Sequence, residues 1–360
     1  MTTAKLELES NLSIIRRPQT ALEANLFAPN RILSEMTLNL LAVAEETAPT
    51  RIDLDLLVRK GKLIQLKKGD IQEDIEAFRL FYQAAFAGHS EAQYLISECY
   101  ASGYGVRTDD DLAEIHWLMW LRKSAESGFS LAQREVAVLY SGCWSLRSFG
   151  FQFTASDIET DNEKAAQWFQ KAAMQGDSLS QGLLGNSYAT GNGVPQDGSK
   201  AVYWYIKAAE QGVSAFQFHL ACCYRDGKWI PQDYSEAARW YRKAAEQGNA
   251  QAQNMLGILY ENGAGVSEDY DLAIRWYRKA AELGNAESQY RIGTDYHVSR
   301  RSEIQSDLRY AIAWYQLAAD NGYELAVGKA QELTKYLTPT ELQGARAFYR
   351  ELKEKHSPRV

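Results

Sequence analysis

The chain has 360 residues, with 46 acidic and 39 basic side chains and a net charge of −7 at pH 7. Lys and Arg are interleaved with Asp and Glu, so a nucleic-acid partner is not predicted. No apolar run approaches the about 18 residues of a transmembrane helix, and the first residues include acids where a signal peptide has an apolar core. These features predict a cytoplasmic protein, with secretion without a signal peptide as an open alternative.

Residues 1–48 are expected to form an extension outside the regular part of the chain. The first thirty residues lack periodicity and contain Pro18 and Pro29, which indicates a flexible segment. Residues 30–46 predict an amphipathic helix, because their apolar side chains lie close to helical spacing, at Ile32, Leu33, Met36, Leu40 and Val43. This helix is expected either to cap the first repeat or to dock onto another protein.

One phrase recurs at nearly fixed spacing. It reads WFQKAAMQG at 168–176, WYIKAAEQG at 204–212, WYRKAAEQG at 240–248 and WYRKAAELG at 276–284. The second Ala of each phrase, called the anchor, falls every 36 residues, at Ala173, Ala209, Ala245 and Ala281. Weaker copies have their anchors at Ala85, Ala125 and Ala319. A period of about 20 to 50 residues predicts a solenoid, in which each unit buries its apolar face against its neighbours.

Each copy predicts two helices joined by a glycine turn. A Gly stands three residues after every anchor, where it can end a helix in the left-handed conformation. Counted from the anchor, Gln at position 8, an apolar residue at 11, a mostly small residue at 12 and Tyr at 15 share one side of the next helix. An Asp is then expected to cap the following helix, at Asp109, Asp197, Asp233 and Asp269. That second helix carries Ala and, three residues later, Trp, as at Ala237 and Trp240.

The pattern A-x-x-W-Y-x-K-A-A-x-x-G, followed by A-Q-x-x-L-G-x-L-Y-x-x-G-x-G-V, resembles the Sel1-like repeat, a relative of the tetratricopeptide repeat. Residues 250–281 match it nearly throughout, and some version of it covers 77–336. The resemblance implies an all-α fold: a right-handed α-solenoid of about eight helix-turn-helix repeats. It also implies an adaptor or scaffold, often in bacterial signalling, envelope biogenesis or host interaction.

The solenoid is expected to span 49–355, with atypical ends that shield the terminal core. Residues 50–87 predict a degenerate first hairpin, and 338–355 predict a capping helix that starts at Thr338, Pro339 and Glu341. The main break is an insertion at 141–160, which has no helical period and contains Trp144, Phe149, Phe151 and Phe153. These aromatic residues are expected either to bind a partner or to fold back over the second and third repeats.

No catalytic, cofactor or metal site is predicted. The five His residues are scattered, and the G-x-G turns recur as helix ends without the rest of a dinucleotide fingerprint. Adjacent cysteines on a helix point about 100° apart, so Cys222 and Cys223 suit a chelate poorly. One branch of the family carries a regularly spaced Cys pair in each repeat. This chain departs from that pattern, and free thiols are expected at Cys99, Cys143, Cys222 and Cys223.

A Lys recurs on the second helices, at Lys123, Lys171, Lys207, Lys243 and Lys279. These side chains could form a basic stripe. Because acidic residues are interleaved with them, a solvated outer face is the preferred interpretation.

The first helices of stacked hairpins line a concave surface, and their positions 9, 10, 13 and 16 are expected to face this groove. The residues there vary between copies and include aromatic side chains, Arg and Met, as protein interfaces do. The predicted protein-binding residues are Tyr94, Arg134, Phe218, His219, Asn254, Met255, Ile258, Tyr290 and Arg291. Phe218, Met255 and Tyr290 are expected to line up as a ladder.

Together with the resemblance, these features predict a non-enzymatic adaptor that holds a protein or peptide segment in its groove, and the resemblance implies a role in bacterial regulation, signalling or complex assembly. Two alternatives come from the resemblance. One is an envelope-associated hydrolase or lactam-binding protein of the cysteine-rich type, and the other is a secreted factor that engages a host. The identity of the protein partner stays open.

Overall fold

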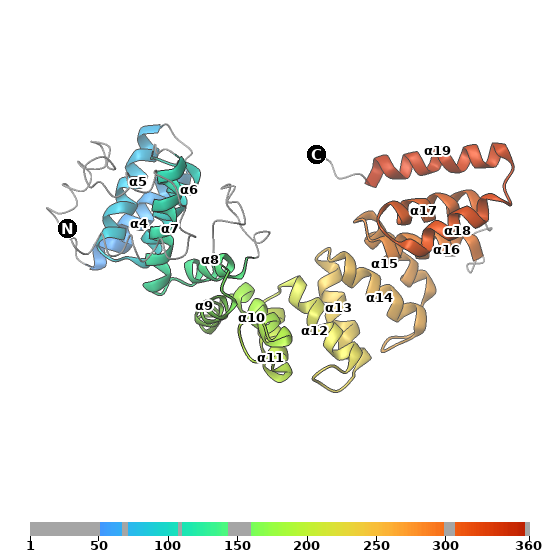
Figure 1. Ribbon diagram of the computed structural model, residues 1–360, viewed down its shortest axis with the longest axis horizontal. Helices are drawn as coiled ribbons and strands as arrows, with labels where there is room; N and C mark the ends of the chain where they lie inside the picture. The colour runs from blue at the N-terminus through green and yellow to red at the C-terminus, as the bar shows by residue number, and fades with distance from the viewer. Residues whose placement is uncertain (1–50, 67–70, 107–109, 143–159, 299–306, 357–360) are drawn as a thin grey trace. The chain divides into compact units, whose positions relative to one another are not determined.

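The computed structural model describes residues 51–66, 71–106, 110–142, 160–298 and 307–356. These ranges contain sixteen α-helices and no strands, which confirms the all-α prediction (Figure 1). Several predictions lie outside the described residues: the extension 1–48 with its helix at 30–46, the cap Asp109, and the insertion residues Trp144, Phe149, Phe151 and Phe153.

The chain divides into two compact units, Met1–Gln196 and Asp197–Val360. Unit 1 contains α4 (Arg51–Leu66), α5 (Ile71–Phe86), α6 (Ser90–Ser102), α7 (Asp110–Glu126), α8 (Ser130–Ser141), α9 (Asn162–Met174) and α10 (Ser178–Thr190). Unit 2 contains α11 (Gly198–Glu210), α12 (Ser214–Asp226), α13 (Tyr234–Glu246), α14 (Ala250–Asn262), α15 (Tyr270–Glu282), α16 (Ala286–Val298), α17 (Leu308–Asp320), α18 (Glu324–Thr334) and α19 (Pro339–His356). Taken in chain order, these helices alternate between first and second helices of an α-solenoid, as the repeats predict.

The second helices end in a common way. After α13, the N–H of Gly248 donates to the Ala245 carbonyl at 3.0 Å, and the N–H of Asn249 donates to the Ala244 carbonyl at 3.1 Å. This pair of bonds is a Schellman motif, which needs positive φ at its glycine, and Gly248 has φ +86°. The predicted helix end is confirmed, because positive φ occurs at Gly88, Gly128, Gly176, Gly212, Gly248, Gly284 and Gly322.

The Gln at position 8 closes the same turn from the other side. In six copies its Nε2 donates to the anchor Ala carbonyl at 3.0–3.2 Å, from Gln93, Gln133, Gln181, Gln217, Gln253 and Gln289. A carbonyl at the end of a second helix therefore receives a donor from the first helix that follows. The spacing predicted the buried side of this Gln, and the structure adds the reason for an amide of this length: it spans the turn.

The predicted Asp caps are confirmed at Asp197, Asp233 and Asp269. At the start of α13, Oδ1 of Asp233 accepts from the N–H groups of Ser235 and Glu236 at 2.9 and 3.0 Å. The N–H of Asp233 donates to the Tyr224 carbonyl at 2.9 Å, which ties the cap to the end of α12. The same arrangement recurs at Asp161 and Asp307.

Two glycines mark close approaches in unit 2. A Cβ added to Gly257 on α14 would lie 2.5 Å from a ring carbon of Tyr277 on α15, as expected for the small residue at position 12. Gly265, in the turn before α15, lies against the start of α13, where an added Cβ would overlap the Tyr234 carbonyl. The turn of one repeat therefore rests on the second helix of the preceding repeat.

In one repeat the large and the small residue of this contact change places. Trp229 stands one period before Gly265 and has φ +69°, the single positive φ among the described non-glycine residues. At the start of α11, one period before Tyr234, stands Gly198, and a Cβ there would overlap the Trp229 ring. A large turn residue thus meets a residue without a side chain, and the packing of turn on helix is preserved.

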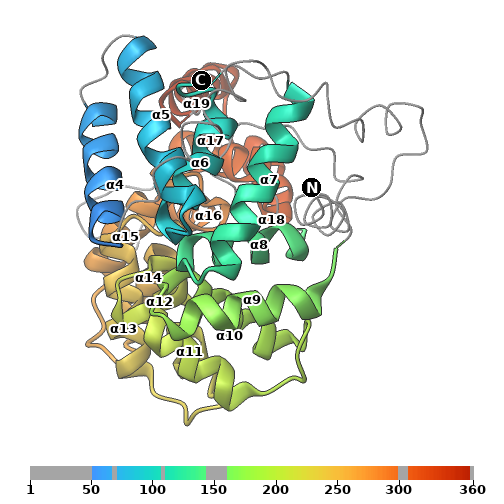
Figure 2. The same cartoon turned by 90° about the vertical axis from the view of Figure 1, so that its left-hand side faces the viewer.

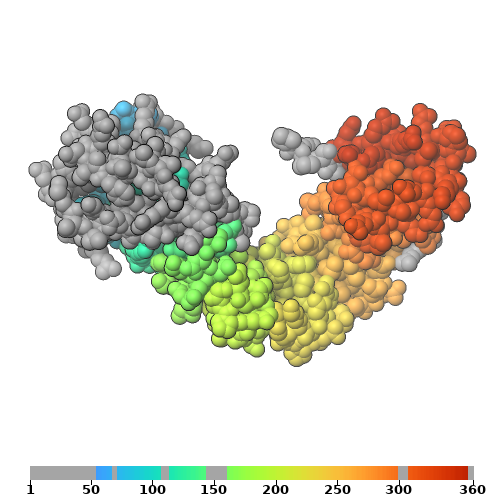
Figure 3. All heavy atoms as spheres, viewed as in Figure 1, coloured from blue at the N-terminus to red at the C-terminus, as the bar shows by residue number. Residues whose placement is uncertain are grey.

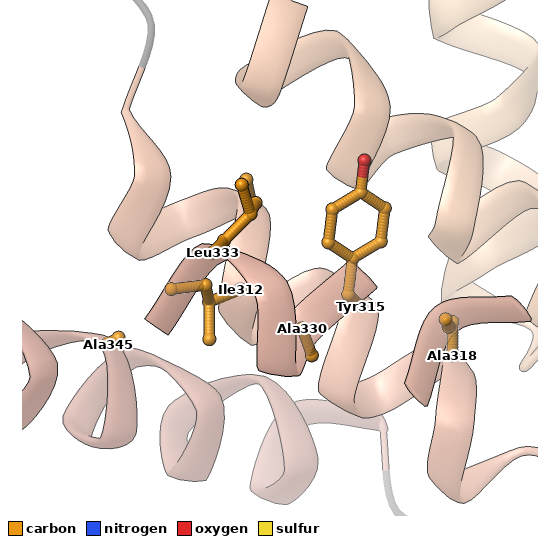
Figure 4. Packing of buried hydrophobic residues seen from close by; sticks show 8 residues of the cluster. Ile312, Tyr315, Ala318, Ala330, Leu333 and Ala345 are labelled. Atoms are coloured by element: carbon orange, nitrogen blue, oxygen red, sulfur yellow. The ribbon is translucent and has the colours of Figure 1, made fainter. Parts of the chain in front are cut away.

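The C-terminal end of unit 2 closes with an apolar cluster. Ile312 from α17, Leu333 from α18 and Ala345 from α19 are buried together (Figure 4). Helix α19 begins with a capping box, as predicted: Thr338 donates its N–H to Glu341 Oε2 at 2.9 Å and accepts from the Glu341 N–H at 3.4 Å. Helix α19 packs on α17, as a terminal cap would.

At the other end of the described chain, α4 packs against α5 (Figure 2). A Cβ added to Gly61 on α4 would lie 2.5 Å from a ring carbon of Phe81 on α5. The hairpin expected at 50–87 therefore uses the same close contact as the complete repeats. Residues 67–70, between its helices, lie outside the described part of the chain.

Candidate protein-binding surface

The predicted binding residues lie on first helices, in two groups. Tyr94 is on α6 and Arg134 on α8, both in unit 1. The other seven are on α12, α14 and α16 in unit 2. We call this second group the first-helix face of unit 2: Phe218, His219, Asn254, Met255, Ile258, Tyr290 and Arg291. Protein binding by either group stays a prediction.

In unit 1, both predicted residues are engaged with neighbouring elements. The ring of Tyr94 lies 5.3 Å from that of Phe129, at the start of α8. The guanidinium of Arg134 donates to Asp177, at the start of α10, at 3.0 Å. Asp177 also caps α10 by accepting from a backbone N–H. Arg134 therefore links the first helices α8 and α10.

Beside them, Glu98 on α6 is a half-buried acid whose Oε1 has no hydrogen-bond partner among the described residues. Burial, and then the nearby Glu135 carboxylate, raises the pKa of Glu98 to about 7, while a hydrogen bond with Tyr94 acts in the opposite direction. The folded chain therefore favours protonated Glu98. The resulting stability is present below the pKa of the unfolded chain and is lost as the pH rises through about 7.

In unit 2, contacts at equivalent positions join the three first helices. Nη1 of Arg225 on α12 lies 2.9 Å from Sδ of Met255 on α14. One repeat later, Nη1 of Arg291 on α16 donates to Oε2 of Glu261 on α14 at 3.0 Å. Each contact connects position 16 of one repeat with position 10 of the next. The first helices of unit 2 therefore lie next to one another, as a ladder requires.

The three ladder residues are only partly covered. Phe218, Met255 and Tyr290 are half-buried. The ring of Phe218 lies 5.6 Å from that of Tyr241 on α13, and the ring of Tyr290 lies 4.9 Å from that of Tyr323. These neighbours fix one side of each aromatic ring and leave part of it accessible. Other accessible or half-buried members of the face are His219, Ile258 and Arg291.

Asn254 is the exception, and the expectation that it faces a groove is wrong. Its exposed fraction is 1 %. Its Nδ2 donates to Oε2 of Glu287, and its Oδ1 accepts from the Ser288 hydroxyl, both at 2.8 Å and both on α16. Position 9 of this repeat therefore belongs to the packing between α14 and α16. The variation of position 9 between copies suggested a surface role. In this repeat the variation instead reflects a polar contact between α14 and α16.

The sequence did not predict a basic cavity on the second-helix side of unit 2. The cavity measures about 380 Å³ and lies between α13 and the turn before α15. Its lining contains three cations and one acid, and consists of Ser235, Ala238, Arg239, Arg242, Lys243, Glu246, Gly265 and Val266. The signal was present in the phrase R-W-Y-R-K at 239–243, but only the turn of the next repeat turns these side chains into the wall of a cavity.

The described residues contain no group of three or more His, Cys, Asp or Glu placed to hold a metal ion. Their three cysteines are free thiols, with Cys99 and Cys223 buried and Cys222 half-buried. Burial raises the pKa of Cys223 to about 11, so this thiol stays protonated and is a poor nucleophile at neutral pH. In the same part of the chain, no helix combines the length and apolar character needed to span a bilayer.

Known proteins share this repeat. A model of the Sel1 repeat matches residues 90–129, 150–177, 178–213, 214–249, 250–285 and 286–323, more than half of the chain. The chain belongs to the Sel1 repeat family. The match at 250–285 begins with the first residue of α14 and ends just before α16, so one Sel1 repeat here is one first helix and one second helix. Sel1 repeats generally mediate interactions between proteins and are generally not enzymes.

Two solved structures are similar over most of this Sel1 repeat protein. A protective antigen present in uropathogenic Escherichia coli strains is 26% identical, with a TM-score of 0.57, over 88% of this chain and 71% of that one. A Sel1 repeat protein from Oxalobacter formigenes is 24% identical, with a TM-score of 0.56, over 72% of this chain and 96% of that one. The second likeness concerns the fold alone. No curated protein sequence matches the chain.

Proposed function

We propose that this Sel1 repeat protein is a non-enzymatic cytoplasmic adaptor, which binds a protein or peptide segment at the first-helix face of unit 2. The observation that carries the proposal is the row of half-buried Phe218, Met255 and Tyr290 on adjacent first helices. None of the three occupies a position used for the helix ends or the turn amides. Partly exposed aromatic and long apolar side chains on a packed surface are typical anchors of protein interfaces.

Arg291 adds a polar contact beside this row. Its guanidinium donates to Glu261 at 3.0 Å and to Glu287 at 2.8 Å, so the side chain is held in place. A side chain that is already ordered loses little conformational entropy when it binds. The proposed partner segment therefore combines apolar side chains for Phe218, Met255 and Tyr290 with an acceptor for Arg291.

The test compares one triple variant with the parental chain in affinity capture from the native cell. The change Phe218→Ala, Met255→Ala, Tyr290→Ala should preserve helicity by circular dichroism and weaken binding of the captured partner by about tenfold or more. Tyr203→Ala is the matched control, since Tyr203 lies on second helix α11 and is 53% exposed. The control should bind like the parental chain.

A folded triple variant that binds the same proteins with parental affinity removes this assignment. Turnover of lactam or glycan substrates by the parental chain would instead favour the enzymatic alternative. Phe218 contacts the ring of Tyr241, and Tyr290 contacts the rings of Tyr315 and Tyr323 and packs against the C-terminal apolar cluster. The melting temperature of the triple variant is therefore measured alongside binding, and a decrease is expected.

A further inference from the structure

We propose that the basic cavity beside α13 is a second binding site, which takes an acidic peptide segment. The cavity is formed by a second helix and a turn, so it is separate from the first-helix face of unit 2. Helix α13 and this turn belong to the yellow and light orange part of unit 2 in Figure 3. A volume of about 380 Å³ is large enough to hold a side chain of a partner.

Two cations of the cavity are positioned before any ligand arrives. Nζ of Lys243 lies 4.1 Å from the centre of the Trp240 ring, and the guanidinium of Arg242 donates to the Tyr260 hydroxyl. Neither cation forms an ion pair within the described part of the chain. A carboxylate entering the cavity would therefore meet two ordered positive charges with no competing anion bound to them.

The remaining charges of the lining do not cancel this excess. Arg239 is paired with Glu236 at 2.6 Å, which leaves that pair neutral. Glu246 is the one acid in the lining. Ala238 and Val266 provide an apolar wall that the methylene groups of a bound acidic side chain can contact.

The next second helix carries a similar set of cations. Helix α15 repeats the phrase R-W-Y-R-K, and Nζ of Lys279 lies 4.2 Å from the centre of the Trp276 ring. The exposed cations of α15 are Arg275, Arg278 and Lys279. They form no ion pairs in the described chain. Cations repeated on two consecutive second helices suit a segment with several carboxylates better than a single small anion.

The preceding repeat keeps the lysine, at Lys207, but lacks the two arginines. Helix α11 has Tyr203 and Ile206 one period before Arg239 and Arg242. Trp229 there packs over Gly198 at the start of α11, whereas one period later Gly265 lies directly against the start of α13. The site is therefore specific to the part of unit 2 that starts at α13.

The experiment measures binding of a short fluorescent polyglutamate peptide to the full chain, with a polyglutamine peptide as the neutral probe. Polyglutamate should bind more tightly than polyglutamine, and its affinity should fall as salt is added. The double change Arg242→Gln, Lys243→Gln should weaken binding by about tenfold or more. A second double change on α15, Arg278→Gln, Lys279→Gln, should weaken it to a smaller extent.

The matched control is Arg346→Gln, Lys355→Gln, which removes one Arg and one Lys from exposed positions of α19 and should leave binding unchanged. Equal binding of polyglutamate by the control and by both test variants overturns the proposal. So does equal binding of polyglutamine, full competition by inorganic phosphate, or tighter binding of single-stranded DNA through the same two residues. The triple change at Phe218, Met255 and Tyr290 should not alter polyglutamate binding, so the two proposals fail independently.

Discussion

Two junctions between repeats of unit 2 use the glutamine at position 8 in different ways. Between α12 and α14, Gln217 donates to the Ala209 carbonyl at 3.1 Å, and its Oε1 accepts from Gln247 at 2.8 Å. Between α14 and α16, Gln253 donates to the Ala245 carbonyl at 3.0 Å, but its Oε1 has no partner in the described chain. The residue one period after Gln247 is Leu283, which has no amide to offer.

The α14–α16 junction has polar contacts elsewhere. There Asn254 bonds to Glu287 and Ser288, and Arg291 bonds to Glu261. At the corresponding positions the α12–α14 junction has Phe218 packed on Tyr241 and Met255 beside Arg225. A few positions thus make the same contacts in both junctions, while the others exchange polar for apolar contacts. The exchange determines which side chains reach the surface.

The same rule holds in unit 1. Oε1 of Gln133 accepts from Gln175 at 2.8 Å. Oε1 of Gln93 has no partner among the described residues, and the residue at the donor position of the next repeat is Ser127. An amide oxygen is therefore left without a partner where the following repeat lacks Gln or Asn two residues after its anchor.

The largest expected effect comes from disturbing α14, the helix that both junctions share, through its contact with α15. Gly257→Leu places a side chain against the Tyr277 ring, 2.5 Å from the new Cβ. Overpacking of this kind costs about 3 kcal/mol or more when the backbone must shift, measured by chemical denaturation. Gly328→Leu on α18 is the matched control, because nothing lies within 4 Å of a Cβ there. Equal unfolding curves for the two variants would contradict the assigned packing.

A smaller effect should separate the two junctions. Gln217→Leu removes two hydrogen bonds and leaves the Gln247 amide with its longer bond to the Lys243 carbonyl, at 3.3 Å. Gln253→Leu removes one bond and an oxygen that already lacks a partner. We expect Gln217→Leu to lower the free energy of unfolding by about 1 kcal/mol more than Gln253→Leu. Equal losses would mean that the amide pair contributes nothing.

The smallest effect is a gain. Leu283→Gln should supply the donor that Gln253 lacks and raise the free energy of unfolding by about 1 kcal/mol, with little apolar loss because Leu283 is 56% exposed. Leu283→Ser reproduces the residue found at Ser127 and should give no gain. If Leu283→Gln melts at or below the temperature of Leu283→Ser, the bond does not form.

The sequence predicted the candidate sites only in part. Position within the repeat correctly put Phe218, Met255 and Tyr290 on adjacent first helices. It was wrong for Asn254, because burial there depends on Ser288 and Glu287 from the next repeat. The basic cavity was missed for a related reason, since its wall joins α13 to a turn of the following repeat, at Gly265 and Val266.

By itself the sequence determined the helical repeat, its glycine ends, its Asp caps and the close contact at Gly257, because each depends on local spacing and on the backbone preferences of single residues. Tertiary structure decided which amides find partners, how Trp229 and Gly198 exchange roles, and which variable side chains are buried. These outcomes depend on two residues that lie about one repeat apart, and the packing of each is known only once its neighbour is in place.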